Sequence, residues 1–153
     1  MVNVDQLKQF KIFKGLNDRE IEIIAGIARE ETYDAGKRIF EEKALANNLY
    51  LALDGEVEIK IRGDGEKYVI IDRIGSNDIF GWSAVVEPRT FTAGAWTTKK
   101  TNIIILGGEE LGDIFEKNNH IGYRVVKEIA AVISRRLKAM EKKFVEKMRQ
   151  PGS

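Results

Sequence analysis

The sequence predicts a mainly β domain, an antiparallel β-roll or jelly roll flanked by N-terminal helices and a long C-terminal helix. Apolar residues follow helical spacing at both ends of the chain, and about eight short strand-like runs separated by turn residues lie between them. The length of 153 residues suits one domain, residues 1–153. We expect helices over residues 1–30, the β-roll over 31–107 and helices again over 108–153.

The N-terminal region carries a helix signal with a defined start. Apolar residues recur at helical spacing at Ile21, Ile24, Ala25 and Ala28. Asn17 followed three residues later by Glu20 has the pattern of a capping box, so the helix is expected to begin just after Asn17. The apolar residues upstream predict a short helix or turn that packs on the domain; they are Leu7, Phe10, Ile12, Phe13 and Leu16.

Alternation with a period of two marks the strands. In residues 57–61, Val and Ile alternate with Glu and Lys, which predicts a strand with one solvent-facing side. In residues 49–53, Leu alternates with Tyr and Ala, and residues 67–73 and 101–106 are two further apolar-rich runs. Trp96 lies in another strand-like run and is expected in the core.

The C-terminal region predicts a short helix over residues 108–119 and a long one over 120–148. A heptad row of apolar residues runs along the long helix at Val126, Ala130, Ile133, Leu137, Met140 and Phe144. A second row, Val125, Ile129 and Val132, is expected to face the β-roll. Since the helix is longer than a small barrel can cover, the heptad row predicts a homodimer through the 120–148 helix, with a core face as the alternative.

Composition excludes several classes of protein. The chain has no cysteine, no signal-peptide pattern and no apolar stretch near the roughly 20 residues of a membrane span, so we expect a cytoplasmic protein with no membrane segment. The net charge of +1 argues against binding nucleic acid over the whole surface. Seven basic residues against two acidic ones over 135–149 indicate a solvated helix face, or a helix-borne contact with nucleic acid or membrane.

No metal site or catalytic set is predicted. Metal-binding cupins share a barrel of this kind but need two or three histidines, whereas His120 is the only one here and is expected to start the long helix. No nucleophile–base pair or motif-placed carboxylate pair is present, so we do not expect an enzyme. Only five residues follow Met148, so no DNA-binding helix-turn-helix is expected after the long helix.

Residues 75–93 have the features of an anion site. A Gly-rich turn leads into a short helix-capable stretch, residues 82–86, whose first amides would be unpaired. Arg89 adds a planar guanidinium suited to phosphate, and Gly81 permits close approach of the backbone to a ligand. Thr90 and Thr92 supply hydroxyl groups.

The same segment resembles the phosphate-binding cassette of cyclic-nucleotide-binding domains, which reads roughly Phe-Gly-Glu-Leu-Ala-Leu and then Pro-Arg-x-x-Thr. Residues 80–85 read Phe-Gly-Trp-Ser-Ala-Val, and residues 88–92 read Pro-Arg-Thr-Phe-Thr. The similarity extends to residues 33–40, 49–57 and 134–137. It implies a cupin-like β-roll of the catabolite-activator-like sensor type, cAMP or cGMP as ligand, and signal transduction to an unidentified protein partner.

The resemblance also implies roles for individual residues. Arg89 would pair with the cyclic phosphate, helped by the Thr90 hydroxyl and by backbone amides near Ser83 and Ala84. Gly81 would lie under the ribose. Phe80, Trp82 and Thr92 complete the predicted set of ligand-binding residues.

Four positions depart from the family pattern. Trp82 replaces the glutamate that accepts the ribose 2′-hydroxyl, and losing such an acceptor costs roughly 1–3 kcal/mol. Met140 and Glu141 stand where relatives offer hydroxyls to adenine, and Asn77 replaces a glycine. Trp82 could be a packing aromatic or stack on a ligand. Two hypotheses therefore remain: a sensor for a cyclic nucleotide or related anionic ligand, or a degenerate fold that no longer binds nucleotide and acts as a dimerisation or protein-interaction module.

Overall fold

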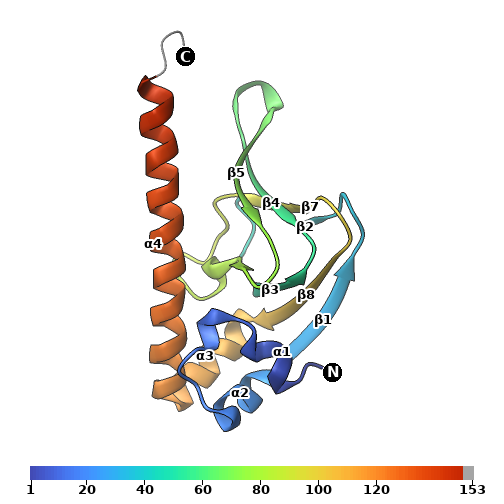
Figure 1. Cartoon of the computed structure of the whole chain (residues 1–153), viewed down its shortest axis with the longest axis vertical. Helices are drawn as coiled ribbons and strands as arrows, with labels where there is room; N and C mark the ends of the chain where they lie inside the picture. Colours follow the sequence, from blue (N-terminus) through green and yellow to red (C-terminus); the bar gives the residue numbers. More distant parts are fainter. Residues whose placement is uncertain (150–153) are drawn as a thin grey trace.

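Two four-stranded antiparallel sheets form the β-roll in the computed structural model, which describes residues 1–149 apart from the Glu66 side chain (Figure 1). The first sheet has the order β1-β8-β3-β6 and the second β2-β7-β4-β5. The strands are β1 (Ala28–Tyr33), β2 (Arg38–Phe40), β3 (Asn48–Asp54), β4 (Val57–Arg62), β5 (Tyr68–Ile74), β6 (Ile79–Phe80), β7 (Gly94–Thr97) and β8 (Thr101–Gly107). The predicted fold class is confirmed, although β1 begins three residues before the expected boundary.

Helices gather at one end of the roll, and the last helix runs along its side (Figure 1). They are α1 (Val4–Lys8), α2 (Asp18–Ala25), α3 (Gly108–Lys117) and α4 (Asn119–Arg149), with short 3-10 turns η1 (Lys11–Phe13), η2 (Asp64–Glu66) and η3 (Trp82–Ala84). The predicted capping box of α2 is present, since the Asn17 side chain accepts from the Glu20 amide at 2.9 Å and the Glu20 carboxylate accepts from the Asn17 amide at 3.0 Å. His120, at the start of α4 as expected, places Nδ1 2.6 Å from the same carboxylate.

Two apolar clusters make up the core. The first joins the N-terminal helices, the first sheet and α4, and it buries Val125, Ile129 and Val132 as the second helical row predicted. The predicted upstream packing residues also belong to it. The second cluster fills the roll with aromatic rings: Phe40 stacks on Phe91 with centroids 3.7 Å apart.

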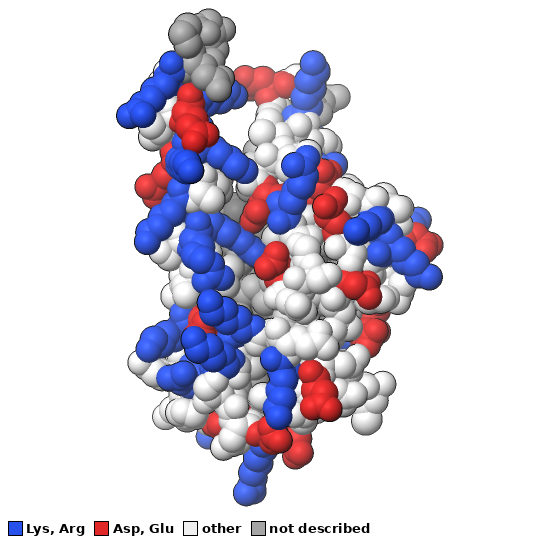
Figure 2. Space-filling view, viewed as in Figure 1, with Lys and Arg blue, Asp and Glu red and all other residues white. Residues whose placement is uncertain are grey.

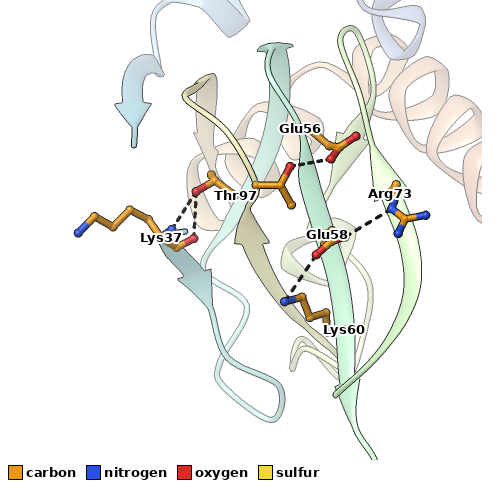
Figure 3. A network of polar contacts seen from close by, with 7 residues as sticks. Lys37, Glu56, Glu58, Lys60, Arg73 and Thr97 are labelled. Carbon is orange, nitrogen blue, oxygen red and sulfur yellow. Dashed lines mark hydrogen bonds and ion pairs between the residues drawn. The ribbon is translucent and has the colours of Figure 1, made fainter. Parts of the chain in front are cut away.

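The outer face of the second sheet carries polar side chains of β4 and corrects the expectation for Trp96. Figure 3 shows Glu58 on β4 between Lys60 and Arg73, with ion-pair distances of 3.6 and 3.4 Å, so this face is covered by paired side chains and Glu58 is only 15% exposed. Trp96 is not in the core, because the register places it opposite Glu58 on this polar face. Its ring meets Tyr68 edge-on, 5.0 Å away.

The heptad row of α4 is mainly solvent-exposed. Leu137 and Phe144 are 56% and 66% exposed, and Ile133 is the member that packs partly against the core. Ile133, Leu137 and Met140 face the roll, but most of the row is exposed, so it is not a buried core face along its whole length. The homodimer stays a prediction. None of the described helices is long and apolar enough to cross a bilayer.

Candidate ligand-binding site

A cavity of about 280 Å³ lies between the cassette, the β4–β5 hairpin and α4. Its lining consists of Phe40, Ile59, Ile61, Ile71, Asp72, Phe80, Gly81, Trp82, Ser83, Phe91, Thr92, Ala93, Ile133, Arg136, Leu137 and Met140. The volume is just below the usual range of about 300–1,000 Å³ for small-molecule sites. Most of these side chains are apolar, and Arg136 is the one cation among the described lining residues.

The backbone at Gly81 turns the chain from β6 into the cassette. Gly81 has φ +78, a left-handed conformation that favours glycine, and a Cβ atom there would lie 2.7 Å from the Tyr50 ring. Tyr50 is buried and stacks on Phe80 at 5.0 Å, and this burial raises the pKa of its phenol. Asn77 has φ +70, so an asparagine does take the left-handed turn where relatives have glycine.

The helix-capable stretch after Gly81 is shorter than expected. It forms only the 3-10 turn η3, in which the Ala84 amide donates to the Gly81 carbonyl at 3.2 Å. Tight i→i+3 bonding uses this amide within the turn, so the expected free amide at Ala84 is wrong in this conformation. Ala84 is fully buried, whereas Ser83 lines the cavity.

Arg89 is held by the cassette itself. Its Nε donates to the Ala84 carbonyl at 3.1 Å, its backbone has φ +61, and its side chain is not part of the cavity lining. Thr90, next to it, forms an isolated bridge with Leu45. The two residues predicted to grip a phosphate therefore lie beside the cavity in this conformation.

Arg136 of α4 reaches the cassette side of the cavity. Its Nη2 donates to the Ile79 carbonyl at 2.6 Å, and its Nε lies 3.1 Å from the Asp72 carboxylate. The guanidinium also lies over the Trp82 ring, 4.9 Å from its centroid. One side chain thus joins α4 to β5, β6 and η3.

Burial shapes the electrostatics of this contact. The Arg136 side chain is 18% exposed, and burial lowers the pKa of its guanidinium, while Asp72 and Asp78 act in the opposite direction. An arginine remains charged at neutral pH despite such a shift. No group of three or more metal-ligating side chains gathers in the described part of the chain. The cavity lining is thus apolar apart from the Arg136–Asp72 pair and the hydroxyls of Ser83 and Thr92.

Comparison with known proteins identifies the family. The model of the cyclic nucleotide-binding domain matches residues 30–118, more than half of the chain. The chain belongs to the cyclic nucleotide-binding domain family. Among solved structures, a provisionally named cyclic nucleotide-binding protein from Geobacter metallireducens superposes on this domain with a TM-score of 0.81 at 28% identity, covering 90% of this chain and 99% of that one.

Two relatives of this cyclic nucleotide-binding domain have named roles. This chain is 27% identical over 103 residues to a cAMP-dependent protein kinase regulatory subunit from Eremothecium gossypii, and the match covers 67% of this chain and 22% of the relative. It is 23% identical over 132 residues to the cyclic AMP receptor protein of Thermus thermophilus, covering 86% of this chain and 59% of the relative. The chain thus spans less than two thirds of either relative.

The structure brings together five of the eight predicted ligand-binding residues of the domain. Phe80, Gly81, Trp82, Ser83 and Thr92 line the cavity, whereas Ala84, Arg89 and Thr90 do not. Whether any of the eight contacts a ligand stays a prediction.

Sequence reasoning missed Arg136 as a cavity residue of the domain. A signal was present, because Val125, Ile129, Val132 and Arg136 continue one helical row at spacings of four, three and four. The row that buries the first three side chains places the fourth at the cavity.

Proposed function

We propose that this domain is a regulatory sensor that binds a cyclic nucleotide, or a related anionic ligand, in the cavity beside the cassette and signals through α4. The observation that carries the proposal is that cassette and helix share one cavity. Trp82 and Ser83 line it from the cassette, and Arg136, Leu137 and Met140 line it from α4. A ligand that contacts both will favour one position of the helix over another.

The phosphate of a cyclic nucleotide would pair with the Arg89 guanidinium. Among the described contacts this guanidinium is bonded to a backbone carbonyl through Nε alone, and a rotation of the side chain exchanges that bond to a neutral carbonyl for one to a charged phosphate oxygen. The names of the two relatives, a cAMP-dependent kinase regulatory subunit and a cyclic AMP receptor protein, support this choice of ligand. Sensing of this kind needs no catalytic group.

Isothermal titration calorimetry with cAMP and cGMP tests the sensor. We expect saturable binding by the wild type and at least about 10-fold weaker binding by Arg89→Ala, because a charge-assisted hydrogen bond is lost. Arg19→Ala is the matched control, since Arg19 is exposed on α2, away from the cavity. Equal affinity of the two variants would contradict the role of Arg89, and absence of binding to either nucleotide would contradict the choice of ligand.

The second candidate is a degenerate fold that acts as a dimerisation or protein-interaction module. Trp82 favours it, because the indole occupies the position of the family's ribose-binding carboxylate and packs partly against the core. The exposed heptad row of α4 supplies a surface for a second copy of the chain. Nucleotide binding created by Trp82→Glu in a chain that otherwise binds none would favour this candidate.

Charge is unevenly divided between α4 and the rest of the domain. The helix carries nine Lys and Arg residues against three Glu, a net charge of +6, although the whole chain has +1. Figure 2 shows these cations along the length of the helix, beside the mixed charges of the roll. In a homodimer formed by the heptad row, the cations would flank the contact rather than enter it, because they lie on other faces of the helix.

A further inference from the structure

The cavity wall is better suited to a hydrocarbon ring than to a ribose. Phe40, Phe80 and Phe91 present aromatic faces, and isoleucines of β4, β5 and α4 close the other sides. Hydroxyl groups come only from Ser83 and Thr92 among the described lining residues. A ligand with several hydroxyls would leave some of them without partners, which is costly in a buried site.

Arg136, the one cation among the described lining residues, has a guanidinium nitrogen that can still donate hydrogen bonds. Arg136 uses Nε for Asp72 and Nη2 for the Ile79 carbonyl, whereas Nη1 makes no hydrogen bond or ion pair with the described residues. A guanidinium pairs with a carboxylate through two parallel N–H···O bonds, which suits a planar acid. The cation that a ligand meets in the cavity is therefore on α4, while Arg89 is outside the lining.

The charge of the wall limits the charge of the ligand. Asp72 lines the same cavity 3.1 Å from Arg136, so the pair is already close to neutral. A second negative charge on the ligand would face this carboxylate in a site partly withdrawn from water, where repulsion is weakly screened. The geometry thus favours a single anionic group.

We propose that the cavity takes an aromatic monocarboxylate, with its ring among the apolar side chains and its carboxylate paired with Arg136. This inference rests on the proposed sensor function but moves the anion-binding residue from the cassette to α4. The ligand carboxylate competes with the Ile79 carbonyl and with Asp72 for the same guanidinium. Occupancy therefore changes the contacts that hold α4 against β5 and β6.

Calorimetry with three probes tests the inference: 1-naphthoate, its neutral isostere 1-naphthamide, and cAMP. We expect the wild type to bind 1-naphthoate at least about 10-fold more tightly than 1-naphthamide, since only the carboxylate forms a charge-assisted pair. Arg136→Met should remove this preference. The matched control Arg135→Met, an exposed neighbour on the same helix, and Arg89→Met should keep it.

The neutral isostere keeps the test valid even if Arg136→Met folds poorly, because the comparison of acid with amide uses the wild type. Equal binding of acid and amide overturns the inference, as does loss of the preference in Arg89→Met instead of Arg136→Met. Binding of cAMP that depends on Arg89, without binding of 1-naphthoate, overturns the inference and leaves the proposed function standing. Absence of binding for all three probes overturns both.

Discussion

Replacing Arg136 with methionine measures how strongly α4 is held to the roll. The substitution keeps an unbranched apolar stem but removes the guanidinium, and with it the 2.6 Å bond to the Ile79 carbonyl and the 3.1 Å ion pair with Asp72. A hydrogen bond from a charged donor contributes about 1.5–3 kcal/mol, and an ion pair of partly exposed groups up to about 1 kcal/mol. We expect the free energy of unfolding to fall by about 2–3 kcal/mol.

Urea unfolding followed by circular dichroism measures this loss, at one fixed protein concentration because self-association would add to apparent stability. Arg135→Met makes the same chemical change at the neighbouring, exposed position and should alter the free energy of unfolding by less than about 0.5 kcal/mol. Asp72→Asn should lower the free energy of unfolding by less than Arg136→Met does, because the hydrogen bond from Arg136 to the Ile79 carbonyl remains. A loss at Arg136 that does not exceed the loss at Arg135 would refute the assignment of this residue as the connection between helix and roll.

Three further predictions concern the turn, the helix cap and the exposed heptad row. Gly81→Ala should destabilise the domain by about 1–3 kcal/mol, because φ is +78 and the new Cβ would lie 2.7 Å from the Tyr50 ring. Gly36→Ala is the control: its φ is +77 but a Cβ there meets no atom within 4 Å, so its loss of stability measures the backbone strain alone. Hydrogen bonds from the Asn17 amide and then from His120 lower the pKa of Glu20 below its usual 4.5. The carboxylate therefore stabilises the fold fully above pH 4.5, and this contribution is lost as the pH falls through the lowered pKa. In Glu20→Gln, the urea concentration at half-unfolding should fall less steeply with decreasing pH than in the wild type. If the wild type is a dimer, Phe144→Glu should convert it to a monomer in light scattering, because Phe144 belongs to the heptad row, is 66% exposed and lies outside the cavity lining. A dimer that persists in this variant would exclude the row as the dimer contact.

The fold was predictable because local patterns and tertiary contacts agree. The capping box before α2 and the buried row of α4 depend on spacings that the chain itself displays, and both occur where expected. Trp96 shows where such reasoning fails: hydrophobicity placed it in the core, whereas strand register places it opposite Glu58. Register depends on pairing with a distant strand, which alternation within one strand does not reveal.

In the candidate site too, residues within one contiguous motif could be predicted, whereas residues whose role depends on tertiary packing could not. Phe80 to Ser83 are contiguous, so finding the cassette in the sequence also locates them at the cavity. The direction of the Arg89 side chain depends on the fold around it, and the Ala84 carbonyl satisfies its Nε in this conformation. The contribution of Arg136 depends on the packing of α4 against β5 and β6, contacts between segments more than fifty residues apart in the sequence.

In the proposed sensor, Arg136 would couple the occupancy of the cavity to the position of α4. It lines the cavity, and it also provides the polar contacts from the middle of α4 to Asp72 and Ile79. A ligand that binds this guanidinium more strongly in one helix position shifts α4 toward that position. By thermodynamic reciprocity, a partner that holds α4 in that position must raise the affinity of the ligand by the same factor. A second copy of the chain on the heptad row would be such a partner. If the helix moves, ligand affinity should then depend on protein concentration; if the helix is fixed, it should not.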